Sequence, residues 1–284
     1  MDITSEKAPP KSPPRSQPIR FGDLWKPHAK IPRRYYVGTV IFSVGALLII
    51  WSVLTYGGFV KPSYFLPSPT QVATTGAHMI QTGELWENTQ ASLTIVIIGW
   101  IVAVLLAVPL GILMGSLQIF EAFLEPIVDF VRYLPVSAMI PLLILYVGIG
   151  PEEKIAVIFI GTFFQLILLV ADVAAHVAND LLDSAYTLGA SRFRVFTTIL
   201  LPATLPGVMD ALRITLGWAW TYLIVAELVA ADHGLGVMIM TSERGLRTDK
   251  IFVGLVTIGL LGFASDISLK WLHRRLLPWS PRLR

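Results

Sequence analysis

Three side chains that can bind metal ions recur at four-residue intervals in the middle of the chain, namely Asp172, His176 and Asp180. On a helix, residues four apart share one face, so this pattern would gather two carboxylates and an imidazole on a single surface. Carboxylates and imidazoles are common ligands of divalent metals. Three ligands on adjacent turns of one helix, however, rarely surround an ion, and helix ends near water are commonly polar. We therefore predict a polar helix end and no metal site.

The sequence lacks the motifs of nucleophilic and metal-dependent hydrolases. It contains no cysteine and five scattered histidines, and neither G-x-S-x-G nor H-E-x-x-H occurs. It also has no G-x-x-x-x-G-K-[ST] and no Gly-Lys pair, so the chain cannot bind nucleotide phosphates by itself. We expect no catalytic residue, no enzymatic activity and no cofactor in this chain.

The composition is typical of an integral membrane protein. Of 284 residues, 54% are hydrophobic and 14% are charged, whereas about a quarter of the residues of a soluble domain are charged. Runs of about 20 apolar residues cross a bilayer as helices, because lipid offers the backbone no hydrogen-bond partner. Five such runs occupy residues 37–56, 91–115, 155–174, 205–231 and 251–272.

A sixth span is harder to place. The apolar run 136–150 is short and contains Pro141, so we extend it upstream into residues 123–135 as a kinked span with an interfacial start. A re-entrant or surface helix is the alternative reading of the same residues. The expected fold class is therefore an all-α membrane protein with about six transmembrane helices.

Lysines and arginines are concentrated in the two terminal tails, and such residues stay on the cytoplasmic side of bacterial membranes. They are Lys7, Lys11, Arg15, Arg20, Lys26, Lys30, Arg33 and Arg34 before the first span, and Lys270, Arg274, Arg275, Arg282 and Arg284 at the other end. With six spans, both termini should be cytoplasmic. We expect a disordered basic tail and interfacial lead-in over 1–36, a membrane domain over 37–272 and a C-terminal tail over 273–284. The net charge of +3 comes mainly from these tails and gives no reason to invoke nucleic acid.

A polar segment, residues 183–206, interrupts the apolar runs on the same cytoplasmic side. Apolar positions up to Leu188 predict a first short helix, and Gly189 is suited to end it in the left-handed conformation. Ser191 can cap a second helix, which we expect to stop near Pro202. A solvated interhelical loop is the alternative interpretation.

This segment resembles the coupling-helix signature of permease subunits of ATP-binding cassette (ABC) transporters, written E-A-A, three residues, G, about nine residues, I-x-L-P. The motif positions are filled by Asp183, Ser184, Ala185, Gly189 and Pro202, with Ile199-Leu200-Leu201 before the proline. The resemblance implies that these residues, together with Ala190 and Arg192 of the same segment, contact the ATPase. Aspartate replaces glutamate and serine replaces alanine at the start of the motif. The acidic side chain is therefore one methylene group shorter than in the usual motif.

Other segments are similar to the nitrate, sulfonate, taurine and bicarbonate permeases within that family. They are FLPSPTQV (65–72), TGELW (82–86), the run 134–155, TYLIVAELVAA (221–231) and the stretch 234–249. The similarity extends from about residue 40 to residue 280. It implies the type I ABC importer permease fold, in which the chain forms the translocation pathway for a small anionic or zwitterionic solute.

The resemblance also implies partners. These are two cytoplasmic ATPase subunits that hold ATP and Mg, a second permease copy in a homodimer, an extracytoplasmic solute-binding protein and the lipid of a bacterial inner membrane. In such importers, ATP binding moves the coupling helices and rocks the permeases between inward and outward openings. The absence of a nucleotide-binding motif in this chain agrees with that division of labour.

Glu227 is the carboxylate that we expect in the pathway. It lies 21 residues after Pro206, and at about 1.5 Å per residue this spans a full hydrocarbon thickness. A carboxylate there is costly unless it faces protein or water. We expect it to hydrogen-bond the backbone of residues 234–249 or Thr248 and to hold an outer gate. A structural hydrogen bond or a position at the outer interface is the alternative.

Other residues of the 205–231 run are secondary candidates. Trp218 and Tyr222 are four apart and share a face, so both are candidates for the pathway, with packing or lipid contact as the alternative. Near the cytoplasmic end of this run, Arg213 can extend toward the interface, and Asp210 is close enough to pair with it.

A stand-alone secondary transporter is the main alternative function. Such a protein would favour inverted repeats and several midplane charges, and neither is visible in the sequence. Among solutes, we favour a sulfonate or taurine over nitrate or bicarbonate, because residues 132–146 differ from the pattern of the nitrate and bicarbonate members.

Overall fold

The computed structural model describes residues 32–60, 65–229 and 232–280, and within these ranges the chain is helical and contains no strand. Five helical stretches are long and apolar enough to cross a membrane: α1 (Arg33–Tyr56), α3 (Glu84–Ser116), α6 (Pro151–Ala175), the continuous stretch Arg192–Val229 and α11 (Thr248–Leu276). They coincide with the five predicted runs and confirm them. The tail that we expect to be disordered lies outside the described residues.

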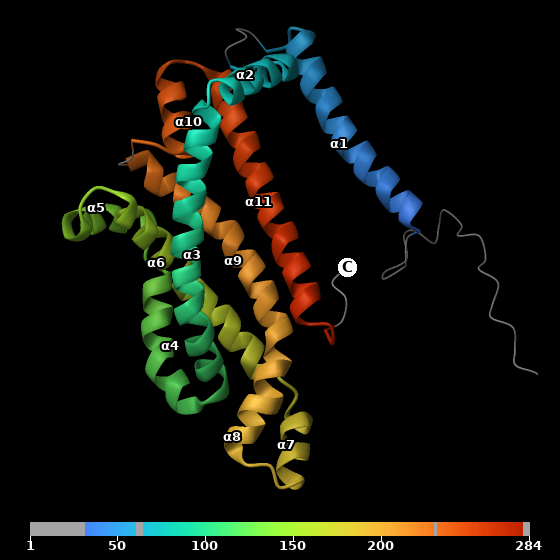
Figure 1. Cartoon of the computed structure of the whole chain (residues 1–284), viewed down its shortest axis with the longest axis vertical. Coiled ribbons are helices and arrows are strands. Elements are labelled where there is room, and N and C mark those ends of the chain that lie inside the picture. The colour runs from blue at the N-terminus through green and yellow to red at the C-terminus, as the bar shows by residue number, and fades with distance from the viewer. Residues whose placement is uncertain (1–31, 61–64, 230–231, 281–284) are drawn as a thin grey trace, which may run out of the picture.

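The core is built by α3, α6 and α9 (Leu201–Val229), which pack side by side (Figure 1). On α3, small residues recur at every fourth position and face α6: Gly99, Ala103, Ala107, Gly111 and Gly115. A Cβ atom added at Gly111 would lie 2.7 Å from the backbone oxygen of Ile167. Small residues therefore let two backbones approach closely, as is common between helices in membranes.

The sixth predicted span is broken more sharply than expected. It consists of α4 (Gln118–Arg132) and α5 (Val136–Val147), which are bent by 98° at a short break between them. The bend lies between Arg132 and Val136, upstream of Pro141, which is contained in α5, and it is compatible with either a broken span or a re-entrant segment. Pro135 provides the physical reason: it disfavours the helical conformation of Leu134 and cannot donate a backbone hydrogen bond.

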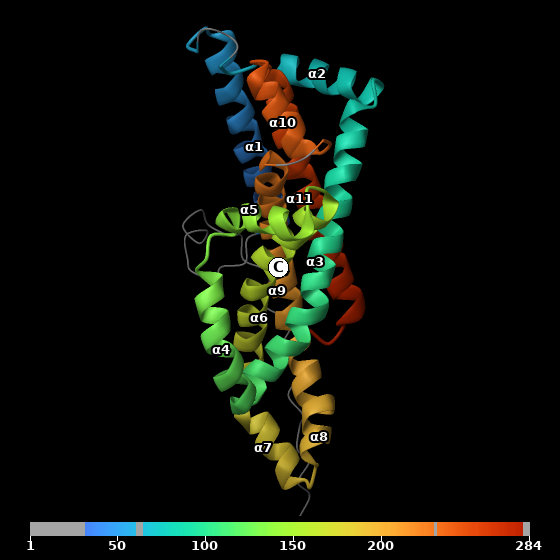
Figure 2. The ribbon, with the colours of Figure 1, turned by 90° about the vertical axis from the view of Figure 1, so that its left-hand side faces the viewer.

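A helix that the sequence analysis did not predict, α2 (Pro69–Gln81), lies across one end of the molecule (Figures 1 and 2). Ser68 begins it with a capping box: its hydroxyl accepts from the Gln71 N–H at 3.3 Å, and its N–H donates to the Gln71 side chain at 2.9 Å. Buried Val72 and Met79 pack with residues of α10 (Leu235–Arg244) and α11. This end therefore has its own small hydrophobic core.

At the opposite end lie α7 (Asn179–Thr187) and α8 (Arg192–Val195) (Figure 1). The second short helix was expected to stop near Pro202, and this prediction is wrong. A π-helical turn, Phe196–Leu200, joins α8 to α9, and the helix continues through Pro202 and Pro206. The Leu201 N–H donates to the carbonyl of Phe196, five residues back. This wider turn lets a proline follow without ending the helix.

Candidate functional site

The predicted coupling segment forms a helical hairpin whose turn is set by Gly189. The Ala190 N–H donates to the Ala185 carbonyl at 3.0 Å, and the Gly189 N–H donates to the Tyr186 carbonyl at 2.9 Å. This pair of bonds is a Schellman motif, and Gly189 adopts the required left-handed conformation with φ of 82°. Ser191 then caps α8, because its hydroxyl accepts from the Arg194 N–H at 3.4 Å. Both turn predictions are confirmed.

The hairpin is anchored on one side and open on the other. Leu182 and Phe196 pack against the core, and Ala185 is buried. By contrast, Leu188 and Phe193 are 88% and 78% exposed. Asp183, Ser184 and Arg192 are exposed as well, and Pro202 is partly buried. The hairpin therefore presents two large apolar side chains on its open side.

At the other end of the molecule, Glu227 is completely buried in α9. Its Oε1 accepts from the Ser92 hydroxyl of α3 at 2.6 Å, and its Oε2 accepts from the Gly236 N–H at 2.6 Å. The expected hydrogen bond between the Glu227 carboxylate and the backbone of residues 234–249 is therefore confirmed, with the Gly236 N–H as the donor. Glu227 connects three helices, because Gly236 belongs to the first turn of α10.

Two polar residues of α3, which the sequence analysis missed, complete this network. Ser92 also accepts from the Leu235 N–H at 2.8 Å, and Asn88 accepts from the Gly234 N–H at 2.9 Å. Three successive N–H groups at the start of α10 are thus bound by side chains of α3 and α9, which satisfies donors that a helix start leaves free. A Cβ at Gly234 or Gly236 would collide with Glu227. We call Asn88, Ser92, Glu227 and residues 234–236 the α10 clamp.

The other pathway candidates lie apart from the α10 clamp. Thr248 is the first residue of α11 and is not a partner of Glu227, so that part of the prediction is wrong. Next to it, Asp249 accepts from Thr75 at 2.8 Å and pairs with Arg247 at 2.9 Å. The hydrogen bonds to Asp249 raise the pKa of Arg247. These contacts tie α2 to the start of α11.

The aromatic residues of α9 also have separate surroundings. Trp218 is 37% exposed. Tyr222 instead packs on Gly161 of α6 and lines a cavity of about 260 Å³ next to the break between α4 and α5. The two rings therefore do not join Glu227 in one site.

Further ion pairs lie in α6, α9 and α11. Arg213 binds Asp210 at 3.1 Å, as predicted, and also binds Asp266 of α11 at 2.8 Å. The second partner connects α9 to α11 and was not predicted, because it lies on a different span. Near the end of α6, Asp172 and His176 lie 3.3 Å apart on an exposed surface.

Comparisons with known proteins agree with the placement of these elements. Residues 107–278 match the family model described as "Binding-protein-dependent transport system inner membrane component". The taurine transport system permease protein TauC of Escherichia coli K12 is 34% identical, over 84% of this chain and 90% of the relative. The putative aliphatic sulfonates transport permease protein SsuC of Bacillus subtilis is 31% identical, over 82% of this chain and 84% of the relative.

Solved structures share the fold. A chain of the inward-facing MetNI methionine ABC transporter superposes with a TM-score of 0.54 at 20% identity, covering 64% of this chain and 92% of that chain. A chain of the bacterial alginate ABC transporter, in complex with its periplasmic protein, superposes with a TM-score of 0.58 at 13% identity. The superposition covers 86% of this chain and 96% of that chain. This protein belongs to the family of inner-membrane components of binding-protein-dependent transport systems, and it is a permease subunit of an ABC importer.

Proposed function

We propose that two copies of this chain form the transmembrane pathway of a bacterial inner-membrane importer for a small sulfonate, with an aminosulfonate such as taurine as the preferred solute. Two cytoplasmic ATPase subunits bind the α7–α8 hairpin, and a solute-binding protein docks at the end formed by α2 and α10. Both termini are cytoplasmic in this arrangement. The basic tails at the two ends of the sequence support that orientation.

The hairpin is the observation that carries the coupling part of the proposal. Its shape depends on Gly189, and its exposed apolar side chains, Leu188 and Phe193, are not covered by any neighbour within the described residues 32–60, 65–229 and 232–280. A groove on an ATPase subunit would bury both. The chain has no motif for binding nucleotide phosphates, so ATP and Mg are held by the partner subunits.

The solute class rests on the relatives. Relatives named for taurine and for aliphatic sulfonates both align over most of this chain. Taurine and alkyl sulfonates share an acid group that stays ionised at neutral pH. A sulfonate is thus the chemical group that these relatives' solutes have in common.

The coupling role is tested by copurification of the ATPase with Gly189→Val. Valine at a left-handed position costs about 1–2 kcal/mol and misdirects α8 relative to α7, so we expect the variant to lose the ATPase. Phe193→Asp, which changes an exposed side chain without backbone strain, should lose it too. Gly83→Val is the matched control, because Gly83 has φ of 80°, open space around its Cβ and a position at the other end of the molecule. An intact ATPase complex with both hairpin variants would refute the coupling role.

We further propose that the α10 clamp is an outer gate. Release of the clamp would free the N-terminus of α10, where Asn88 and Ser92 of α3 now bind the N–H groups of Gly234 and Leu235. The buried position of Glu227 and its two hydrogen bonds support this role.

A further inference from the structure

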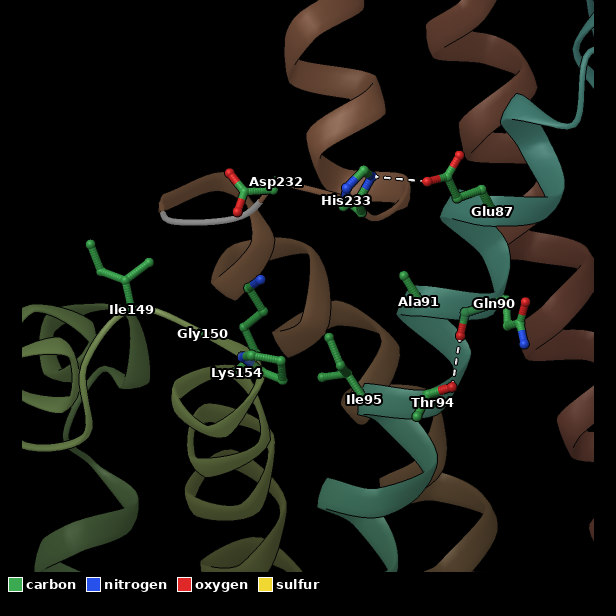
Figure 3. A pocket seen from close by; sticks show the side chains of 11 residues that line it. Glu87, Gln90, Ala91, Thr94, Ile95, Ile149, Gly150, Lys154, Asp232 and His233 are labelled. Atoms are coloured by element: carbon green, nitrogen blue, oxygen red, sulfur yellow. Dashed lines mark hydrogen bonds and ion pairs between the residues drawn. The ribbon is translucent and has the colours of Figure 1, made fainter.

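A pocket of about 510 Å³ opens beside the α10 clamp. Its walls come from α3, the start of α6 and the connection between α9 and α10 (Figure 3). The charged residues among those that line it are Glu87, Lys154 and Asp232, and His233 adds an imidazole. Gln90 and Thr94 of α3 supply further polar groups.

Lys154 is the unusual member of this group. Only 5% of the residue is exposed, yet its ammonium makes no hydrogen bond or ion pair with any residue that the structure describes. In Figure 3 its side chain extends from the start of α6 toward the connection that carries Asp232 and His233. Although most of the Lys154 side chain is covered, the residue lines the pocket, so an acid group that enters the pocket can form a charged hydrogen bond with its ammonium.

The surrounding charges restrict which acids can enter. Two carboxylates, Glu87 and Asp232, line the pocket together with the single ammonium of Lys154. Carboxylates therefore outnumber the ammonium among the residues that line it. A solute that carries only negative charge would therefore be repelled by more groups than attract it.

The same carboxylates favour a solute that also carries a positive charge. Glu87 already has a neighbour, because its Oε1 lies 3.4 Å from His233 Nδ1. Asp232 makes no ion pair within the described part of the chain, and it lines the same pocket as Lys154. One unpaired cation and one unpaired carboxylate thus face a common space.

We propose that this pocket is a solute subsite within the permease and that it takes a small zwitterion. The acid group binds Lys154, and the ammonium group of the solute binds Asp232. The proposal rests on the importer function proposed above and narrows its solute class: an aminosulfonate fits the pocket, whereas a simple sulfonate or an inorganic anion does not.

The test measures equilibrium binding of radiolabelled 2-aminoethanesulfonate to the permease–ATPase complex in lipid nanodiscs, with the binding protein left out. Competition by 2-hydroxyethanesulfonate, which has the same acid group and length but no ammonium, measures the contribution of the second charge. Unlabelled 3-aminopropanoate, a zwitterionic carboxylate of similar length, is the third ligand. We expect saturable binding in which both zwitterions compete and 2-hydroxyethanesulfonate competes about tenfold less well or worse, since a charged hydrogen-bonded pair is lost.

Four variants locate the site. Lys154→Met should weaken zwitterion binding about tenfold or more, and Lys154→Arg should retain most of it, because the charge is kept. Asp232→Asn should weaken the binding of 2-aminoethanesulfonate but leave the binding of 2-hydroxyethanesulfonate unchanged or improved. Glu152→Gln is the matched control, because it removes an exposed charge near Lys154 in the sequence but outside the pocket. Assembly of the complex should be normal in all four, and the control Glu152→Gln should also keep the basal ATP hydrolysis of the wild type.

The outcomes separate this proposal from the proposed function. Unchanged binding by Lys154→Met, equal competition by 2-hydroxyethanesulfonate, or no binding of either zwitterion to the wild-type complex would overturn the subsite. If the complete wild-type importer takes up no sulfonate, but 3-aminopropanoate binds and Lys154→Met abolishes that binding, the subsite stands and the sulfonate assignment fails.

Discussion

At the residue scale, Glu227 shows how a carboxylate is accommodated inside a membrane protein. Burial of an isolated charge is prohibitive, but each oxygen of Glu227 accepts one short hydrogen bond. Ser92 relays the network, because it donates to Glu227 and accepts from the Leu235 N–H. The start of α10 is therefore held by side chains that belong to other helices.

Substitutions of Glu227 test the outer gate. Glu227→Gln keeps a carbonyl acceptor for Gly236 and an amide that can donate to Ser92, so we expect it to retain much of the transport activity. Glu227→Ala leaves the Gly236 N–H without its acceptor, a loss of about 1–3 kcal/mol. We expect the alanine variant to assemble and hydrolyse ATP while transporting little solute.

Both rates are measured in proteoliposomes, as ATP hydrolysed and as solute taken up. Glu243→Ala removes an exposed carboxylate from the same helix, α10, and should behave as wild type. A fully coupled Glu227→Ala variant would mean that Glu227 has no part in a gate.

The sequence predicts the location of Glu227 but not its partners. Its depth follows from the helical rise after Pro206, whereas Ser92 is 135 residues away in the chain and looks like an ordinary serine in an apolar run. Likewise, Lys154 has no distinguishing feature in the sequence among the basic residues outside the two terminal tails. Its significance depends on burial and on Asp232, which only the folded structure brings near.

At the element scale, the packing of α3 on α6 depends on the row of small residues on α3. Gly111→Val would place side-chain atoms against the backbone of α6, where a Cβ alone already lies 2.8 Å from Val170. We expect loss of about 1–3 kcal/mol or more of stability, together with a lower yield of assembled complex. Thermal unfolding of the purified complex measures the change.

Gly217→Ala is the control for this prediction. Gly217 lies within α9, and no atom would come within 4 Å of an added Cβ. Alanine is the better helix former, so the control should be neutral or slightly stabilising. Equal stability of the two variants would show that close contact between α3 and α6 is unimportant.

Helices are predicted from this sequence more reliably than the breaks between them. Long apolar runs identify five spans, and the Gly189 and Ser191 turn has a local signature that survives in the structure. The capping box at Ser68 and Gln71 was also present in the sequence as S-P-T-Q and could have revealed α2. By contrast, the helix breaks at Pro135 but continues through Pro202. Whether a helix can continue through a proline depends on the geometry of the neighbouring turns, which the proline residue itself does not reveal.

At the scale of the whole molecule, the two functional regions lie at opposite ends of the helical core. The hairpin of α7 and α8 is at one end, and α2, α10 and the α10 clamp are at the other (Figures 1 and 2). Helix α9 joins them, since it continues from the hairpin through the π-helical turn and carries Glu227 near its far end. One continuous helix, held to α11 by the ion pair between Arg213 and Asp266, thus connects the hairpin with the α10 clamp.

The most direct test is uptake of radiolabelled 2-aminoethanesulfonate into proteoliposomes that contain this chain as the sole permease, together with its ATPase and its solute-binding protein. The account predicts uptake that requires ATP on the ATPase side and the binding protein on the opposite side. Gly189→Val should abolish this uptake, whereas Gly217→Ala should not. Uptake by this chain without the ATPase, driven by an ion gradient alone, would contradict it.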